Sequence, residues 1–261
     1  GRGSGAGVGA GAVAGAVAGA DPGAGARAGA GAGVGARAGA GAGAVAGHSL
    51  GEYSALVVAG VLSSVEGARL VAARGDAMAA AAAARPGTMA AVLGLGPDGV
   101  AKACADVDGV WVANDNAPGQ IVIAGTAEGV AQAGDAARGL GAKRVVPLAV
   151  GGAFHSPLMA SAQSDLDAAL ADADFHDGSI DCVANVDAEA HRAAGDWRRL
   201  LSAQLTSQVR WRESVLRLDR LGVTRYVELG PGGELSGMVK RIIDGAVRIT
   251  VGVPDDIAAL G

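Results

Sequence analysis

The chain has 261 residues, half of them hydrophobic, and a formal net charge of −5. That apolar content can bury a substantial core in one or two domains, which excludes a disordered protein, and the negative balance argues against a general nucleic-acid binder. The two cysteines, Cys104 and Cys182, match no metal or redox spacing, so we expect free thiols in a reducing compartment.

The first 46 residues have an anomalous composition, because all but eleven of them are Gly or Ala. Such a segment loses much conformational entropy on folding and has little apolar area to offset the loss, so we expect no stable layer from it. Three interpretations stay open: a silk-like arm, a flexible linker, or a region whose true side chains differ from this sequence. The third is favoured, since the strand that follows needs neighbours. No signal peptide or membrane span is evident, and we expect a cytoplasmic protein.

The first motif that carries chemistry is Gly47-His48-Ser49-Leu50-Gly51, which has the G-x-S-x-G form of a nucleophile elbow. Residues 44–46 predict a short buried strand before it, and residues 53–60 an apolar helix after it. Ser49 would then sit exposed at a helix N-terminus, where amide groups can stabilise an oxyanion. In a chain with 45 Gly, chance alone supplies such a match roughly a few tenths of the time, so the motif needs support.

A capping box formed by Ser63 and Glu66 predicts a second helix, which runs to about Ala84. One face of this helix is apolar apart from a single arginine: Leu70, Val71, Arg74 and Met78. An arginine on a core-facing stripe is costly unless it meets an anion, which makes Arg74 a candidate binding residue. The alternative is an arginine that extends along its own methylenes to water.

Residues 87–150 predict a compact unit of the ferredoxin-like pattern βαββαβ. The expected elements are strand 88–93, helix 97–106, strands 110–113 and 120–124, helix 127–139 and strand 143–150. The polar run 114–119 predicts a loop between the two middle strands.

His155 follows directly on a predicted strand and precedes a helix that begins with proline. Loops beyond strand ends are where sites collect in α/β sheets, and a serine nucleophile needs such a base. A buried structural histidine is the competing interpretation. His48 adjoins Ser49, but strand alternation predicts that it points away.

The rest of the chain alternates helix and strand, which predicts an α/β sheet with covering helices, interrupted by the 87–150 unit. The expected helices are 159–172, 196–206, 211–221 and 234–243, and the expected strands are 180–185, 224–229 and 247–251.

Seven segments in this order give a specific resemblance: GHSLGEYSALVVAGVLS, VAARGDAM, TMAAVLG, ANDNAPGQIVIAG, GAFHSPLM, QLTSQVRW and VELGPGGELSG. Together they resemble the malonyl-CoA:acyl carrier protein transacylases of fatty acid synthesis and the related polyketide acyltransferases, from Val45 to Ile243. The resemblance implies a large α/β-hydrolase-like subdomain, residues 1–86 and 151–261, with a ferredoxin-like subdomain inserted at 87–150.

The resemblance also implies the activity. A malonyl group would move from coenzyme A to the phosphopantetheine thiol of an acyl carrier protein through an acyl-serine intermediate. No metal or redox cofactor is needed. The expected partners are the carrier protein and a coenzyme A thioester, without nucleic acid or membrane, and we expect a monomer.

Residue roles follow from the same resemblance. Ser49 is the nucleophile, His155 its base and Arg74 the clamp for the malonyl carboxylate. The remaining expected substrate-binding residues are Met78, Asn116, Gln120 and Phe154, with Phe154 linked to malonyl selection. The loop at Gly230 would supply the carbonyl that orients His155. Two donors form the oxyanion hole, the Leu50 amide and the position of Arg2, where family members carry a glutamine that this chain lacks.

Two rival classes remain: a serine esterase or thioesterase of α/β-hydrolase type, and a Gly-rich structural protein. The hydrolase triad runs Ser, acid, His with the base late in the chain, whereas His155 is mid-chain. The acids ahead of it, such as Asp115 and Asp135, belong to the inserted unit. A structural protein does not explain residues 47–261.

Overall fold

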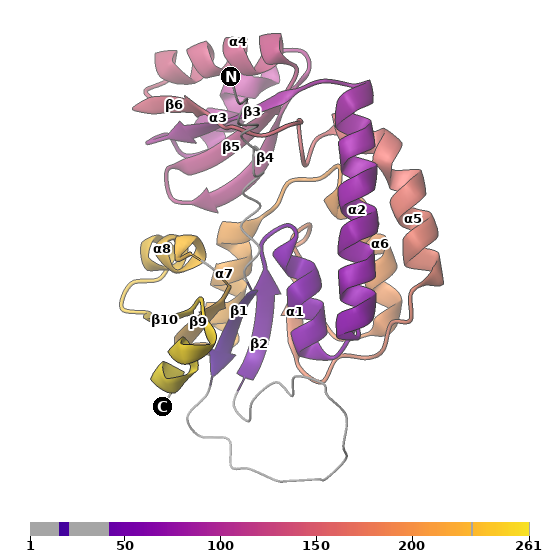
Figure 1. Cartoon of the computed structure of the whole chain (residues 1–261). Helices are drawn as coiled ribbons and strands as arrows, with labels where there is room; N and C mark the ends of the chain where they lie inside the picture. Colours follow the sequence, from indigo (N-terminus) through magenta and orange to yellow (C-terminus); the bar gives the residue numbers. More distant parts are fainter. Residues whose placement is uncertain (1–15, 21–41, 231, 261) are drawn as a thin grey trace, which may run out of the picture.

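The computed structural model describes residues 16–20, 42–230 and 232–260, which form two parts, each built on its own sheet (Figure 1). The strands of the larger part are β1 Ala16–Ala20, β2 Ala42–Gly47, β7 Asp181–Val183, β8 Ala190–His191, β9 Arg225–Leu229 and β10 Val247–Val251. They lie in the order β10-β9-β1-β2-β7-β8. The pairs β2–β7 and β9–β10 are parallel, whereas β1 is antiparallel to both of its neighbours.

Strand β1 corrects the expectation that the Gly/Ala segment makes no layer. Ala16–Ala20 lies inside the sheet and pairs with β2 on one side and β9 on the other. The ordering of this strand comes from two backbone ladders rather than from side-chain area, which is why its composition gives no signal.

Helices cover both faces of this sheet. On one face are α1 Gly51–Ala59, α2 Ser64–Ala84, the 3₁₀ turn η1 Pro157–Ala162, α5 Gln163–Asp172 and α6 Ala194–Gln204, and on the other are α7 Trp211–Arg220 and α8 Glu234–Ile242 (Figure 1). Strand β2 serves both layers, since Val45 packs with the first group of helices and Ala44 and Ala46 pack with the second. No helix in the described part of the chain is long and apolar enough to cross a membrane.

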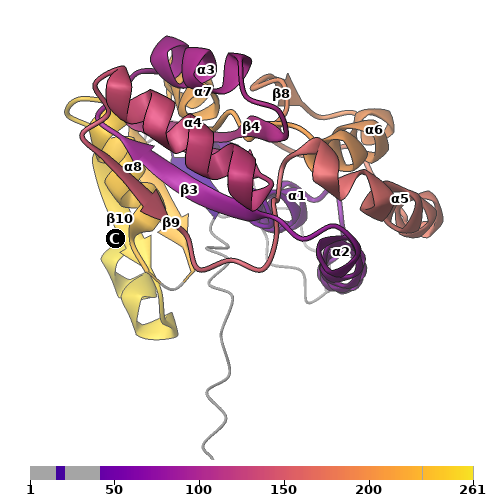
Figure 2. The same cartoon turned by 90° about the horizontal axis from the view of Figure 1, so that it is seen from above.

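The smaller part has four antiparallel strands: β3 Thr88–Leu93, β4 Val110–Ala117, β5 Gln120–Gly125 and β6 Arg144–Pro147. Their order in the sheet is β4-β5-β3-β6, and the helices α3 Pro97–Ala105 and α4 Ala127–Gly139 cover one face (Figure 2). The predicted α/β class with a ferredoxin-like unit is confirmed.

The predicted loop 114–119 is wrong. Strand β4 continues to Ala117 through two register irregularities, and only Pro118 and Gly119 form the turn, with Gly119 at φ 66°. Bulges let the strand keep its ladder while its polar residues meet partners outside the sheet. Smaller differences are the 3₁₀ turn that precedes α5, the unpredicted β8, and a C-terminal 3₁₀ helix, η2 Pro254–Leu260.

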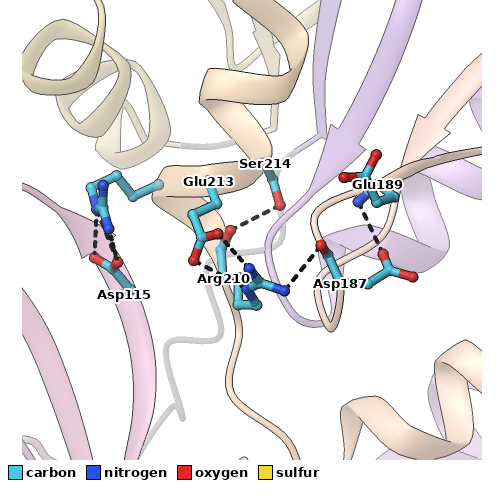
Figure 3. Close-up of polar contacts among 7 residues, drawn as sticks. Asp115, Asp187, Glu189, Arg210, Glu213 and Ser214 are labelled. Atoms are coloured by element: carbon cyan, nitrogen blue, oxygen red, sulfur yellow. Dashed lines mark hydrogen bonds and ion pairs between the residues drawn. The ribbon is translucent and has the colours of Figure 1, made fainter. Parts of the chain in front are cut away.

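The two parts are joined along β4. The backbone of Val209 pairs with β4, donating to the Ala113 carbonyl at 2.9 Å and accepting from the Asp115 amide at 3.0 Å. Asp115 is buried, and its carboxylate accepts hydrogen bonds of 3.1 and 2.9 Å from Arg212 Nε at the start of α7 and forms an ion pair of 2.7 Å with a terminal nitrogen of the same guanidinium. Figure 3 shows Asp115 facing α7, with Arg210 held between Glu213 and Asp187. This junction fixes the small part against the edge of the large one.

Candidate active site

Ser49 occupies the sharp turn between β2 and α1 and has a left-handed backbone with φ 54°. A Cβ added at Gly47 would lie 1.8 Å from the Gly51 carbonyl oxygen, so the strand and helix can approach this closely only without a side chain there. The strained turn presents the Ser49 hydroxyl at the carboxyl end of the strand.

His155 lies beside Ser49, although 106 residues separate them in the chain. The Ser49 hydroxyl donates to His155 Nε2 at 2.7 Å, and His155 Nδ1 donates to the Gln204 carbonyl at 2.9 Å. The second bond fixes the tautomer that leaves Nε2 free to accept a proton. Burial, and then the charge of Arg74, lower the pKa of His155 to about 3. The imidazole is therefore neutral at neutral pH, as a base must be.

The expectation that the Gly230 loop orients His155 is wrong. The carbonyl that does so belongs to Gln204, the last residue of α6, whereas the Gly230 amide donates to Val251 at the far side of the sheet. The last carbonyls of a helix have no partner within it, which leaves the Gln204 oxygen available to His155.

Arg74 projects from α2 to the same point and is 4% exposed, so it does not extend to water. One terminal nitrogen donates to Ser49 Oγ and to Gln204 Oε1, each at 3.0 Å. Its Nε is buried and has no hydrogen-bond partner among the described residues. A buried cation with an unused donor beside a nucleophile is suited to an anionic ligand.

Three polar residues missed by the sequence analysis surround this centre. Glu52 is 1% exposed and accepts from the Asn185 amide at 2.7 Å and from the Gln204 side chain. Burial raises the pKa of Glu52 to about 8, and hydrogen bonds from Asn185 and Gln204 oppose the rise. Asn185 accepts from the Ser49 amide at 2.7 Å and donates to Gly47. Glu52 and Gln204 lay within the recognised segments, but the spacing of the sequence gave neither a role.

Of the remaining predicted substrate-binding residues, some lie near the Ser49 turn and one does not. Asn116 reaches the turn through His48, whose Nε2 donates to its side-chain oxygen at 2.8 Å, and the Phe154 ring is half-buried between the cores of the two parts. Met78 is buried in the core one turn from Arg74. Gln120 does not join them, because its side chain accepts from Arg241 on α8 instead.

The structure describes one of the two predicted oxyanion donors. The Leu50 amide lies at the start of α1 beside Ser49 and has no hydrogen-bond partner among the described residues. The second expected donor, Arg2, lies outside the described residues. The structure shows no group of three metal-ligating side chains in the residues it describes.

Comparison with known proteins places the chain. The acyl transferase domain model matches residues 34–244. The malonyl CoA-acyl carrier protein transacylase of Bacillus subtilis is 43% identical over 214 residues, which is 80% of this chain and 68% of the relative. The enzyme of the same name from Escherichia coli K12 is 41% identical over 215 residues, 81% of this chain and 70% of the relative.

Solved structures agree. An acyl carrier protein S-malonyltransferase from Vibrio cholerae superposes with a TM-score of 0.81 at 39% identity, covering 84% of this chain and 73% of the other. A malonyl-transacylase in complex with a type II polyketide synthase acyl carrier protein gives 0.78 at 40% identity, covering 82% and 71%. The chain therefore belongs to the acyl transferase domain family.

Proposed function

We propose that this chain is a malonyl-CoA:acyl carrier protein transacylase, which moves malonyl from coenzyme A to a carrier-bound phosphopantetheine thiol. The observation that carries the substrate assignment is the buried Arg74 guanidinium, hydrogen-bonded to the nucleophile Ser49 at 3.0 Å. The free malonyl carboxylate is the anion that this cation can take up, and the unused Nε offers a second donor for a bidentate pair.

The first half-reaction forms the acyl-serine. His155 Nε2 removes the Ser49 proton as Oγ attacks the thioester carbonyl, and the Leu50 amide stabilises the resulting oxyanion. Collapse of the tetrahedral intermediate breaks the C–S bond, and His155 returns the proton to the departing coenzyme A thiolate.

The second half-reaction reverses these roles. His155 takes the proton of the phosphopantetheine thiol, the thiolate attacks the malonyl-serine ester, and the proton returns to Ser49 Oγ when it leaves. The exchange uses two thiols and no redox step, and we propose that the chain needs no metal or cofactor. Activity that survives dialysis against EDTA would support this part of the proposal.

The esterase alternative fits the site less well. His155 is oriented by a neutral carbonyl rather than by a carboxylate, and a buried cation next to the nucleophile gives no advantage with a neutral ester. We further propose that the enzyme is a cytoplasmic monomer. Light scattering of the purified chain would test its oligomeric state.

Intact-mass spectrometry tests the proposal directly. Incubation with malonyl-CoA should add one malonyl group, peptide mapping should place it on Ser49, and a holo carrier protein should remove it. The Ser49→Ala variant serves as the control and should stay unmodified. An acyl group on another residue, or hydrolysis to free malonate without transfer, would contradict the assignment.

A further inference from the structure

Gln204 contacts Ser49, His155 and Arg74, the three residues whose side chains take part in the proposed reaction. Its backbone carbonyl accepts from His155 Nδ1 at 2.9 Å. Its side-chain oxygen accepts from Arg74 at 3.0 Å, and its side-chain nitrogen donates to the Ser49 carbonyl at 2.9 Å. The residue is fully buried, so water cannot replace any of these partners. The orientation of the Gln204 side-chain amide therefore determines whether the Arg74 guanidinium has an acceptor on that side.

A primary amide has two ends of nearly the same shape, one accepting and one donating. Arg74 can only donate, so it needs the oxygen end of Gln204. If the amide turned over, the guanidinium would face an NH₂ group, and Arg74 would lose its only side-chain hydrogen bond, among the described residues, apart from that to Ser49 Oγ. The observed orientation is therefore maintained only if a hydrogen-bond acceptor holds the NH₂ group on the opposite side of the Gln204 amide.

Glu52 supplies that requirement. Its Oε2 accepts from the Gln204 nitrogen, while its Oε1 accepts from the Asn185 amide at 2.7 Å, so both carboxylate oxygens face N–H donors. The Ser49 carbonyl is the second acceptor for the Gln204 nitrogen. Because both of its oxygens face N–H donors, Glu52 acts as an acceptor at each of them, and its Oε2 is an acceptor that only the nitrogen end of the Gln204 amide can satisfy.

We propose that Glu52 is a positioning residue for malonyl recognition: by holding the nitrogen end of the Gln204 amide, it directs the oxygen end to Arg74 and keeps the guanidinium aligned for a carboxylate. This inference rests on the proposed malonyl transfer. Glu52 touches neither substrate nor reacting atoms, and its effect passes through Gln204. It should therefore act on the choice between malonyl and acetyl groups more than on the acyl-transfer step itself.

The Glu52→Gln variant tests the proposal because it keeps the shape and replaces one acceptor oxygen with a donor. In this variant the new side-chain amide accepts from the Asn185 backbone amide only if its own NH₂ group faces Gln204. Two NH₂ groups would then face each other, so the Gln204 amide has to rotate by 180° and present its oxygen to residue 52. We expect kcat/KM for malonyl-CoA to fall roughly tenfold, the value of one hydrogen bond to a charged group, and kcat/KM for acetyl-CoA to change much less. A merely structural role would lower both values equally and leave their ratio unchanged.

A second variant tests the same proposal independently, in case Glu52→Gln does not fold. Gln204→Met keeps the length and the backbone carbonyl that orients His155, but it removes both ends of the amide. The malonyl-to-acetyl ratio should fall here too. Adding Glu52→Gln to Gln204→Met should produce no further change in the ratio, because the effect runs through the amide. A further fall in the double variant, or an unchanged ratio in Gln204→Met, would overturn the proposal.

Matched controls come from the same residue types elsewhere. Glu66 lies in the first turn of α2, and Gln163 donates to Ser202 at 3.3 Å away from the site. Glu66→Gln and Gln163→Met should keep the wild-type ratio, and thermal unfolding should verify that every variant is folded. Wild-type protein that fails to malonylate Ser49 would refute the proposed function. Wild-type transfer with an unchanged ratio in Glu52→Gln refutes only this inference.

Discussion

The guanidinium of Arg74 donates directly to the hydroxyl of Ser49, with 3.0 Å between nitrogen and oxygen. In the proposed reaction, the cation that would bind the substrate carboxylate therefore already touches the atom that would attack the substrate carbonyl. In malonyl-CoA these two groups are separated by a single CH₂, so one bound conformation places the carboxylate at Arg74 and the thioester carbon near Oγ.

Replacement of Arg74 should lower kcat/KM for malonyl-CoA but not for acetyl-CoA. A buried carboxylate without its partner costs about 3–5 kcal/mol, which corresponds to a fall of roughly 10²–10³ in kcat/KM for malonyl-CoA in Arg74→Ala. Acetyl-CoA has no free carboxylate and should react as before or faster. Arg74→Lys should rescue little, because an ammonium cannot copy a bidentate fork. The matched control is Arg69→Ala on the exposed side of the same helix, with 56% of its side chain exposed. Equal losses for both thioesters would make Arg74 a structural residue.

The acid limb of the pH–rate profile should lack an inflection near 6.5. Because burial and Arg74 lower the pKa of His155 to about 3, the base stays unprotonated, and malonylation of Ser49 should keep its rate down to about pH 5. His155→Ala should slow acylation by about 10²–10⁴ at every pH in this window. Quenched-flow mass spectrometry of the acyl-enzyme gives the rate. An apparent pKa near 6.5 would mean that the imidazole is exposed to water during turnover.

The same lowered pKa makes a prediction for stability. Between about pH 3 and 6.5, the unfolded chain binds a proton at His155 that the folded chain does not, so the free energy of unfolding should decrease as the pH falls through this range. The expected loss approaches roughly 3–5 kcal/mol near pH 3. Urea unfolding of His155→Ala should show a weaker pH dependence than the wild type. His176→Ala, at a surface position with 63% of its side chain exposed, should keep the wild-type dependence.

Gly47 should tolerate no side chain. The added Cβ of Gly47→Ala would lie 1.8 Å from the Gly51 carbonyl oxygen, so the turn must open and Ser49 must move. A displacement of about 1 Å can cost 10²-fold in rate, and we expect at least that loss of Ser49 malonylation. Gly43→Ala is the matched control in the same strand, since nothing lies within 4 Å of its added Cβ. Comparable activity of the two variants would show that the turn is not fixed by close approach.

Phe154 should contribute to selection against methylmalonyl-CoA. The half-buried ring adjoins His155 and packs between the two cores. We propose that it fills the space that an α-methyl group on the substrate would need. One methyl in a pocket is worth about 1–3 kcal/mol, so Phe154→Ala should raise the methylmalonyl-to-malonyl ratio of kcat/KM by about 10–100-fold. Competition of the two thioesters for the acyl-enzyme measures the ratio directly. A wild type that accepts both equally would remove this role from Phe154.

Local signals predicted local structure well. The capping box of Ser63 and Glu66 gave the start of α2, where the Glu66 amide donates to the Ser63 hydroxyl at 3.1 Å, and its predicted end at Ala84 is where the helix stops. Strand 88–93 and helix 127–139 have the predicted bounds, because their apolar periods and turn residues lie within the elements themselves.

The errors have one physical cause, which is that the stabilising partner lies elsewhere in the chain. Asn114, Asp115 and Asn116 look like a loop until Val209 and Arg212 supply their partners. The carbonyl that orients His155 could not be assigned to Gln204 from spacing, because any residue at a helix C-terminus offers one.

Three residues of the larger part contact the same strand pair of the small sheet. Val209 and Arg212 hold β4, and Arg241 holds the β4–β5 turn through the Pro118 carbonyl, whereas β6 forms the opposite edge of the small sheet. These contacts anchor the small sheet along its β4 edge. Because Asn116 lies on this anchored strand, its contact with His48 connects the polar end of β4 to the turn that carries the nucleophile.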